Sequence, residues 1–185
     1  MMTTRRKSLN MLSGGLVVSA VSSLFGAEPT EGATLRMRLP ASTSSDKTKS
    51  LRLDAFHLVI TNHSNERMAV WSDWCSWGWF CPTITIQVGG NTFDFKKTVK
   101  NWWANSPDPF YFDPGDHYVL PINLFSDDWI QPKGFTPGVY ERAVITASYT
   151  IKPDQHTQKL KVWTGTMQIQ ARLILDARMK DKKPS

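Results

Sequence analysis

The chain has 185 residues, of which 41% are hydrophobic and 21% are charged, and this composition predicts one globular domain with a hydrophobic core. Its formal net charge of +6 falls to +3 once the three basic residues of a removable N-terminal segment are set aside, because residues 1–27 contain no acidic residue. So small a balance argues against the concentrated basic face that nucleic-acid binding needs, and we expect no nucleic-acid partner.

Residues 1–27 are predicted to form an export signal peptide. The basic pair Arg5-Arg6 is followed at residues 11–25 by an apolar stretch that contains Ser and Gly and is too short to span a bilayer. The pair, with Leu9 after it, is similar to the twin-arginine pattern, whereas Ser8 departs from that pattern and leaves an ordinary secretory signal as the alternative. Either route predicts a periplasmic or secreted protein whose mature chain has no membrane span.

Residues 28–50 are expected to form a flexible linker that contains one edge strand. Residues 34–39 alternate apolar and polar side chains before Pro40, which is the pattern of a short strand at the edge of a sheet. Residues 41–50 offer almost nothing to bury and predict a mobile segment.

From residue 51 onward, apolar runs and turn residues follow one another at the spacing of strands. Residues 51–61 place Phe56, Leu58 and Ile60 on one face of a strand. Residues 83–88 and 92–96 flank the turn Gly89-Gly90-Asn91 and predict a β-hairpin.

The second half of the chain continues this pattern. Pro121 confines the strand predicted at residues 117–124 to an edge or a bulge, and Gly165 predicts a bulge within the strand region 160–175. Further elements are predicted as strands at residues 68–71 and 139–151, a short helical turn at residues 126–129 and a basic disordered tail at residues 177–185.

Seven or eight strands without a long amphipathic helix predict an all-β fold, namely an antiparallel β-sandwich over residues 51–176. Three short motifs resemble the strand-and-turn pattern of immunoglobulin-like β-sandwiches in exported bacterial envelope proteins: Ile60-Thr61-Asn62-His63-Ser64-Asn65, Asp113-Pro114-Gly115-Asp116 and Gly138-Val139-Tyr140. The same motifs are similar, more faintly, to the bacterial intracellular proteinase inhibitor domain. The resemblance implies an immunoglobulin-like fold and transfers no inhibitory residue.

Cys75 and Cys81 are the two cysteines of the chain and lie in one tryptophan-rich segment. In an exported protein, a solitary pair is expected to form a disulfide, which here would close a small loop. Two buried thiols are the first alternative. A metal site is the second, but it would need further ligands, and no histidine lies nearby at ligand spacing.

The same segment contains four of the eight tryptophans, Trp71, Trp74, Trp77 and Trp79. Exposed indole rings can stack on sugars, so these four are candidate ligand-binding residues for a polysaccharide. The alternative is that two or more of them close the open end of the sandwich, since tryptophan is highly buried on average. If the segment is extended, Trp77 and Trp79 share one side of it.

No catalytic, cofactor-binding or metal-binding constellation is predicted. The acidic residues near the turns are spaced unlike any calcium loop, and aspartate is a favoured turn residue: Asp113, Asp116, Asp127 and Asp128. The four histidines stand singly along the chain, and no nucleophile elbow or phosphate-cradling glycine loop is present.

The sequence therefore predicts a secreted or periplasmic non-catalytic protein that acts by binding or scaffolding, with a protein or polysaccharide partner in the cell envelope. One alternative is a carbohydrate-binding module that uses the segment from Trp71 to Trp79. The second alternative is a protease inhibitor that acts through an exposed loop.

Overall fold

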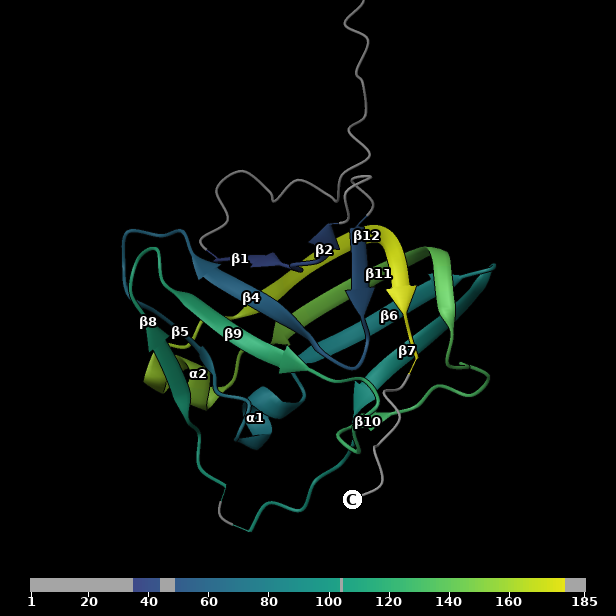
Figure 1. The fold of residues 1–185 in the computed structure, drawn as a ribbon. Helices are drawn as coiled ribbons and strands as arrows, with labels where there is room; N and C mark the ends of the chain where they lie inside the picture. The colour runs from purple at the N-terminus through teal and green to yellow at the C-terminus, as the bar shows by residue number, and fades with distance from the viewer. Residues whose placement is uncertain (1–34, 44–48, 104, 179–185) are drawn as a thin grey trace, which may run out of the picture.

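The computed structural model describes residues 35–43, 49–103 and 105–178 (Figure 1). Within these ranges the chain forms twelve strands and two short helices, so the predicted all-β class is confirmed. The signal peptide predicted at residues 1–27 lies outside the described residues, as do half of the mobile segment predicted at residues 41–50 and most of the tail predicted at residues 177–185.

The smaller of the two main sheets has the order β1-β4-β9 and is antiparallel throughout. Its strands are β1 (Leu35–Arg38), β4 (Phe56–Asn62) and β9 (His117–Ile122). β1 is an edge strand, as the alternation at residues 34–39 predicts. β9 is the other edge, and there Pro121 sits opposite His57 without interrupting a central ladder, as expected for a proline in a sheet.

The larger sheet has seven strands in the order β10-β7-β6-β11-β12-β3-β2. In that order the strands are β10 (Trp129–Ile130), β7 (Asn91–Lys97), β6 (Pro82–Val88), β11 (Val139–Ile151), β12 (Gly165–Asp176), β3 (Lys49–Arg52) and β2 (Ser42–Thr43). The β6–β7 hairpin turns on Gly89 and Gly90, whose φ angles of 56° and 80° suit a two-residue turn and confirm the prediction. β12 and β3 run parallel, so the expectation of purely antiparallel pairing is wrong for this pair of strands.

A two-stranded ladder and the two helices complete the described structure. β5 (Met68–Trp71) pairs antiparallel with β8 (Pro109–Phe112). Helix α1 (Ser76–Trp79) follows β5, and helix α2 (Gln155–Leu160) connects β11 to β12. Figure 1 shows β5, β8 and both helices gathered at one end of the molecule.

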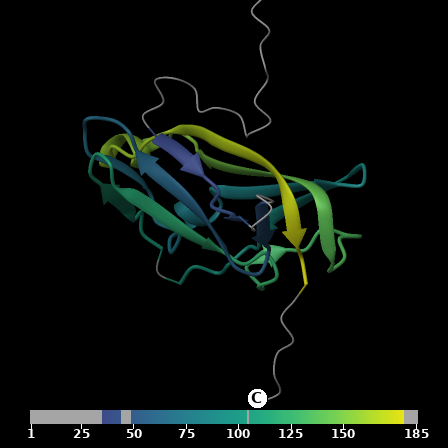
Figure 2. The same ribbon diagram turned by 45° about the horizontal axis from the view of Figure 1, so that its top comes forward.

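The hydrophobic core lies between the two main sheets. Phe56, Leu58 and Ile60 of β4 are buried, as the period-two pattern predicts, and they belong to the same cluster as Ile145 and Tyr149 of β11. Figure 2 shows β4 and β9 in one layer and the long strands β6, β11 and β12 in another. Two layers of mainly antiparallel strands therefore bury one shared interior.

The predicted linker at residues 28–50 contributes more to the fold than expected. Leu35 and Met37 are buried in the core, and Lys49–Arg52 pairs with the end of β12. The prediction failed because the alternation in this segment was too short to show that its apolar side enters the interior. At the other end, Ala177 is fully buried, so the core extends one residue into the predicted tail.

The strand region predicted at residues 160–175 is also corrected, because Leu160 ends helix α2 and the strand begins only at Gly165. A capping box starts the helix: the Asp154 side chain accepts from the Thr157 N–H and the Thr157 hydroxyl accepts from the Asp154 N–H. The helical turn predicted at residues 126–129 is a hydrogen-bonded turn that leads into β10.

Candidate binding site

Two of the four tryptophans in the cysteine-containing segment are structural. Trp71, at the end of β5, is 2% exposed, and its carbonyl accepts a hydrogen bond of 3.0 Å from the buried Tyr149 hydroxyl. Trp79, in α1, is 5% exposed, and its indole N–H donates to the Thr98 carbonyl at 2.7 Å. These two rings are therefore buried, as expected under the alternative that two or more of the four close the core, and they are not part of an exposed platform.

Two ammonium groups cover the ring of Trp79. The Nζ atoms of Lys97 and Lys100 lie 4.0 and 3.4 Å from its ring centroid, which is the geometry of a cation–π contact. Burial lowers the pKa of the half-buried Lys97, although Asp128 opposes that effect. These contacts fix Trp79 against the segment that follows β7.

The chain after β5 forms helix α1 and is not extended. Gly78 lets this helix pack closely against the backbone at the end of β5. A Cβ atom at Gly78 would lie 2.0 Å from the Ser72 carbonyl oxygen, so α1 rests directly on the backbone at the end of β5. The helix separates the two rings that an extended chain would place on one side. The Trp77 ring neighbours that of Trp71, with centroids 6.2 Å apart, whereas the Trp79 ring neighbours that of Trp102, with centroids 6.0 Å apart.

Both cysteines are buried free thiols, so the predicted disulfide is not formed in this structure. Each Sγ atom donates to a backbone carbonyl: Cys75, before α1, to that of Ser72 at 3.3 Å, and Cys81, after α1, to that of Trp77 at 3.0 Å. Burial raises the pKa of the Cys81 thiol to about 12, although the neighbouring Tyr149 hydroxyl acts in the opposite direction. The thiols therefore act as small buried side chains in this conformation.

Trp74 is the exposed tryptophan of the segment, at 77%, and it has an exposed counterpart on the segment that follows β7, where Trp103 is 95% exposed. Asn105 joins the two segments: its side-chain oxygen accepts from the Ser76 N–H at 3.0 Å and its amide group donates to the Ser76 hydroxyl at 2.6 Å. Val99, on the same segment as Trp103, is 88% exposed.

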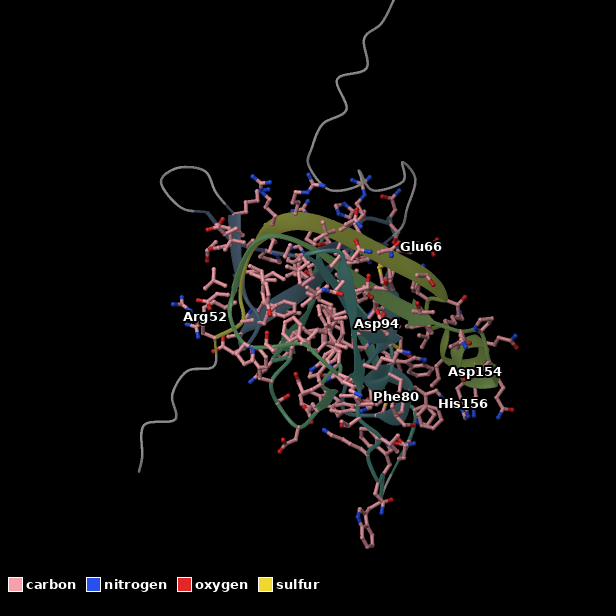
Figure 3. The ribbon with its side chains drawn as sticks, turned by 90° about the vertical axis from the view of Figure 1, so that its right-hand side faces the viewer. Arg52, Glu66, Phe80, Asp94, Asp154 and His156 are labelled. Carbon is pink, nitrogen blue, oxygen red and sulfur yellow. The ribbon has the colours of Figure 1, made fainter. Side chains whose placement is uncertain are left out.

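A pocket of about 340 Å³ opens on the Trp77 side of α1, and we call it the Trp77 pocket. It has an apolar part and a polar part, both drawn from distant parts of the chain. Its lining consists of Trp71, Trp77, Phe80, Cys81, Thr150, Ile151, Lys152 and Asp154. Figure 3 shows the exposed ring of Phe80 on the same side of the molecule as Asp154 and His156.

Two anchors hold the pocket in place. The His156 ring packs against Trp77 with ring centroids 5.1 Å apart. The Thr150 N–H donates to the Cys81 carbonyl at 3.0 Å, which ties β11 to the second residue after α1. Asp154 caps α2, and its hydrogen bond from the Thr157 backbone N–H lowers the pKa of the Asp154 carboxyl, which is therefore ionised at neutral pH. Sequence reasoning missed Phe80, Lys152 and Asp154, although the Asp154–Thr157 capping pattern was present as a signal.

Asp113, Asp116 and Asp128 make local hydrogen bonds or ion pairs, in keeping with their interpretation as turn residues. The Asp113 N–H donates to Asp116, the Asp113 carboxylate lies 3.7 Å from Arg67, and Asp128 pairs with Lys100 at 2.9 Å. Within the described ranges, no group of three or more histidine, cysteine or acidic residues is arranged to hold a metal ion.

Neither helix among the described residues has the length and apolar character that a membrane crossing requires. A scan against protein-family models, a search of curated proteins and a search of solved structures each found no match for this chain.

Proposed function

We propose that this chain is a non-catalytic binding protein of the cell envelope, built on an immunoglobulin-like β-sandwich, that contacts its partner through the end of the molecule around α1. The two layers of mainly antiparallel strands around one core support the architecture. The basic and apolar N-terminal sequence supports export to the periplasm or the medium.

The observation that carries the proposal is the exposure of Trp74 and Trp103 on well-anchored segments. Exposed tryptophans on a folded surface are a mark of interaction sites, because an indole contributes much of the energy of an interface when it is covered. Truncation of such a residue in a complex typically costs roughly 2 kcal/mol or more of binding free energy. Because two hydrogen bonds between Asn105 and Ser76 tie the neighbouring residues together, a partner that covers these rings loses less conformational entropy in doing so.

Site-specific photocrosslinking in cells tests the proposal. A photoreactive residue placed at Trp74 or Trp103 is expected to form a defined adduct with an envelope component. The matched control is Gln170, an exposed polar residue on β12 that lies outside the α1 end. Adducts at all three positions alike, or at none of them, would contradict the proposed surface.

A polysaccharide is the second candidate partner, and the Trp77 pocket favours it because that pocket combines aromatic rings with polar groups. The protease-inhibitor alternative has only the faint sequence resemblance as its support. A panel of secreted proteases assayed with excess protein would separate it from the other two candidates, since only an inhibitor would slow substrate cleavage.

A further inference from the structure

We propose that the Trp77 pocket is a saccharide subsite that seats one pyranose ring of an envelope glycan. This inference rests on the proposed binding function and names the ligand class of one site at the α1 end. Of the four candidate tryptophans named from the sequence, it keeps Trp77 and Trp71, at a single open pocket. Trp77 and Phe80 line that position, and Trp71 forms part of its wall.

The apolar part of the pocket fits the carbon-bound face of a sugar. Trp71, Cys81 and Ile151 line it and are 2 to 4% exposed, so they form a dry inner wall. Phe80 is 48% exposed and Trp77 is half-buried, so their rings are available to a ligand. Aromatic rings offer a large apolar contact area at a small cost in side-chain entropy, which suits a ligand with one apolar face.

The polar part fits the hydroxyl groups of the same ligand. Thr150 supplies a hydroxyl group, Lys152 an ammonium group and Asp154 a carboxylate, which together can donate hydrogen bonds to hydroxyls and accept them. The opposite charges of Lys152 and Asp154 balance, so the rim does not select a strongly anionic or cationic ligand. A neutral polyhydroxylated ring matches both the number and the balance of these groups.

The size of the pocket limits the ligand to a small unit. A volume of about 340 Å³ lies near the lower end of the roughly 300–1,000 Å³ range of small-molecule sites. The pocket is therefore suited to one ring, with neighbouring sugars of a chain extending outside it.

The site is also held before any ligand arrives. His156 packs against Trp77, the capping box fixes Asp154, and the Thr150 hydroxyl bonds to that of Thr166 at 3.0 Å. Figure 3 shows Asp154 and His156 beside the short helix that presents them. Preorganised side chains on strands and helix ends are what a weak, specific sugar contact requires.

The test is titration of the full folded protein with two defined probes, the β-1,4-linked tetramer of N-acetylglucosamine and the α-1,4-linked tetramer of glucose. Binding is followed by calorimetry and by tryptophan fluorescence. At least one probe is expected to bind and to change the fluorescence. Phe80→Ala and Asp154→Asn are each expected to weaken that binding about tenfold.

The variants are chosen to keep the fold. Phe80 is about half exposed, and asparagine caps helices as well as aspartate does, so the capping box of α2 survives Asp154→Asn. Val139→Ala is the matched control, because it truncates an apolar side chain as exposed as Phe80, at the start of β11 and outside both the pocket and the α1 end, and it should leave saccharide affinity unchanged.

Each outcome decides the inference. Binding that both pocket variants weaken and the control retains supports it. Failure of both probes at millimolar concentration, or binding that Phe80→Ala leaves intact, overturns it. If crosslinks at Trp74 or Trp103 still form when neither probe binds, the proposed binding function stands and only the saccharide subsite is lost.

Discussion

Gly78→Ala is expected to destabilise the protein strongly, because α1 has no room for even one methyl group at this position. A Cβ atom there would lie 2.0 Å from the Ser72 carbonyl oxygen, 2.6 Å from the Ser72 carbonyl carbon and 2.9 Å from the Trp71 carbonyl oxygen. All three atoms belong to the backbone, so a side-chain rotation cannot relieve the overlap. Ordinary overpacking costs roughly 1–3 kcal/mol, and we expect a loss of about 3 kcal/mol or more here.

Urea denaturation followed by tryptophan fluorescence measures the effect. The matched control is Gly138→Ala, where the nearest atom to an added Cβ is a Tyr140 ring carbon at 4.0 Å and the backbone φ is not positive. That control should be neutral, or it should stabilise the protein by roughly 0.4–1 kcal/mol because alanine lowers the conformational entropy of the unfolded chain. Equal midpoints for Gly78→Ala and the wild type would refute the close packing of α1 on β5.

Three further predictions concern buried or charged groups. Both thiols should resist an aromatic disulfide reagent in the native protein and react only on unfolding; rapid native labelling would contradict their burial, and no labelling after unfolding would indicate a bridge. Tyr149→Phe should cost roughly 1–2 kcal/mol of unfolding free energy, because the Trp71 carbonyl loses its buried donor; an unchanged urea midpoint would count against that bond. The Arg178 guanidinium lowers the pKa of Asp176 from 3.8 to about 2. The small contribution of this exposed ion pair to the free energy of unfolding is therefore present above about pH 4 and should be lost as the pH falls from 4 to 2. Asp176→Asn should remove that part of the acid sensitivity measured by pH-dependent unfolding.

The period-two pattern predicted the strands well where one face is buried. Phe56, Leu58 and Ile60 alternate with less buried neighbours, and the hairpin at Gly89-Gly90 follows from local backbone preferences. Both signals lie within a few residues, so no knowledge of the partner strand was needed. The parallel pairing of β3 with β12 joins distant parts of the chain, and no local pattern predicts it.

The helices were missed for physical reasons that differ between them. α1 has only four residues and depends on the contact of Gly78 with the backbone of Ser72, which is tertiary. α2 has six residues, too few to show an apolar period, although Asp154 and Thr157 mark its start. In each case the helix is shorter than the window in which helical periodicity can be detected.

The candidate site could be predicted only in part. The sequence located the tryptophan-rich segment but could not assign burial, because that depends on distant residues: Lys97 and Lys100 lie over the Trp79 ring, and Tyr149 of β11 binds the Trp71 carbonyl. Lys152 and Asp154 enter the pocket from the far end of β11, so their proximity to Trp77 follows from the sheet order and not from spacing.

Oxidative footprinting tests most directly whether the α1 end is the binding surface. The oxidation rates of Trp74 and Trp103 would be compared between the purified protein and intact cells, with the half-buried Tyr140 near the start of β11, away from α1, as the internal reference. A bound partner should slow oxidation of both tryptophans severalfold in cells while Tyr140 reacts at a similar rate in both samples. Equal rates at all three residues in cells and in solution would contradict the account.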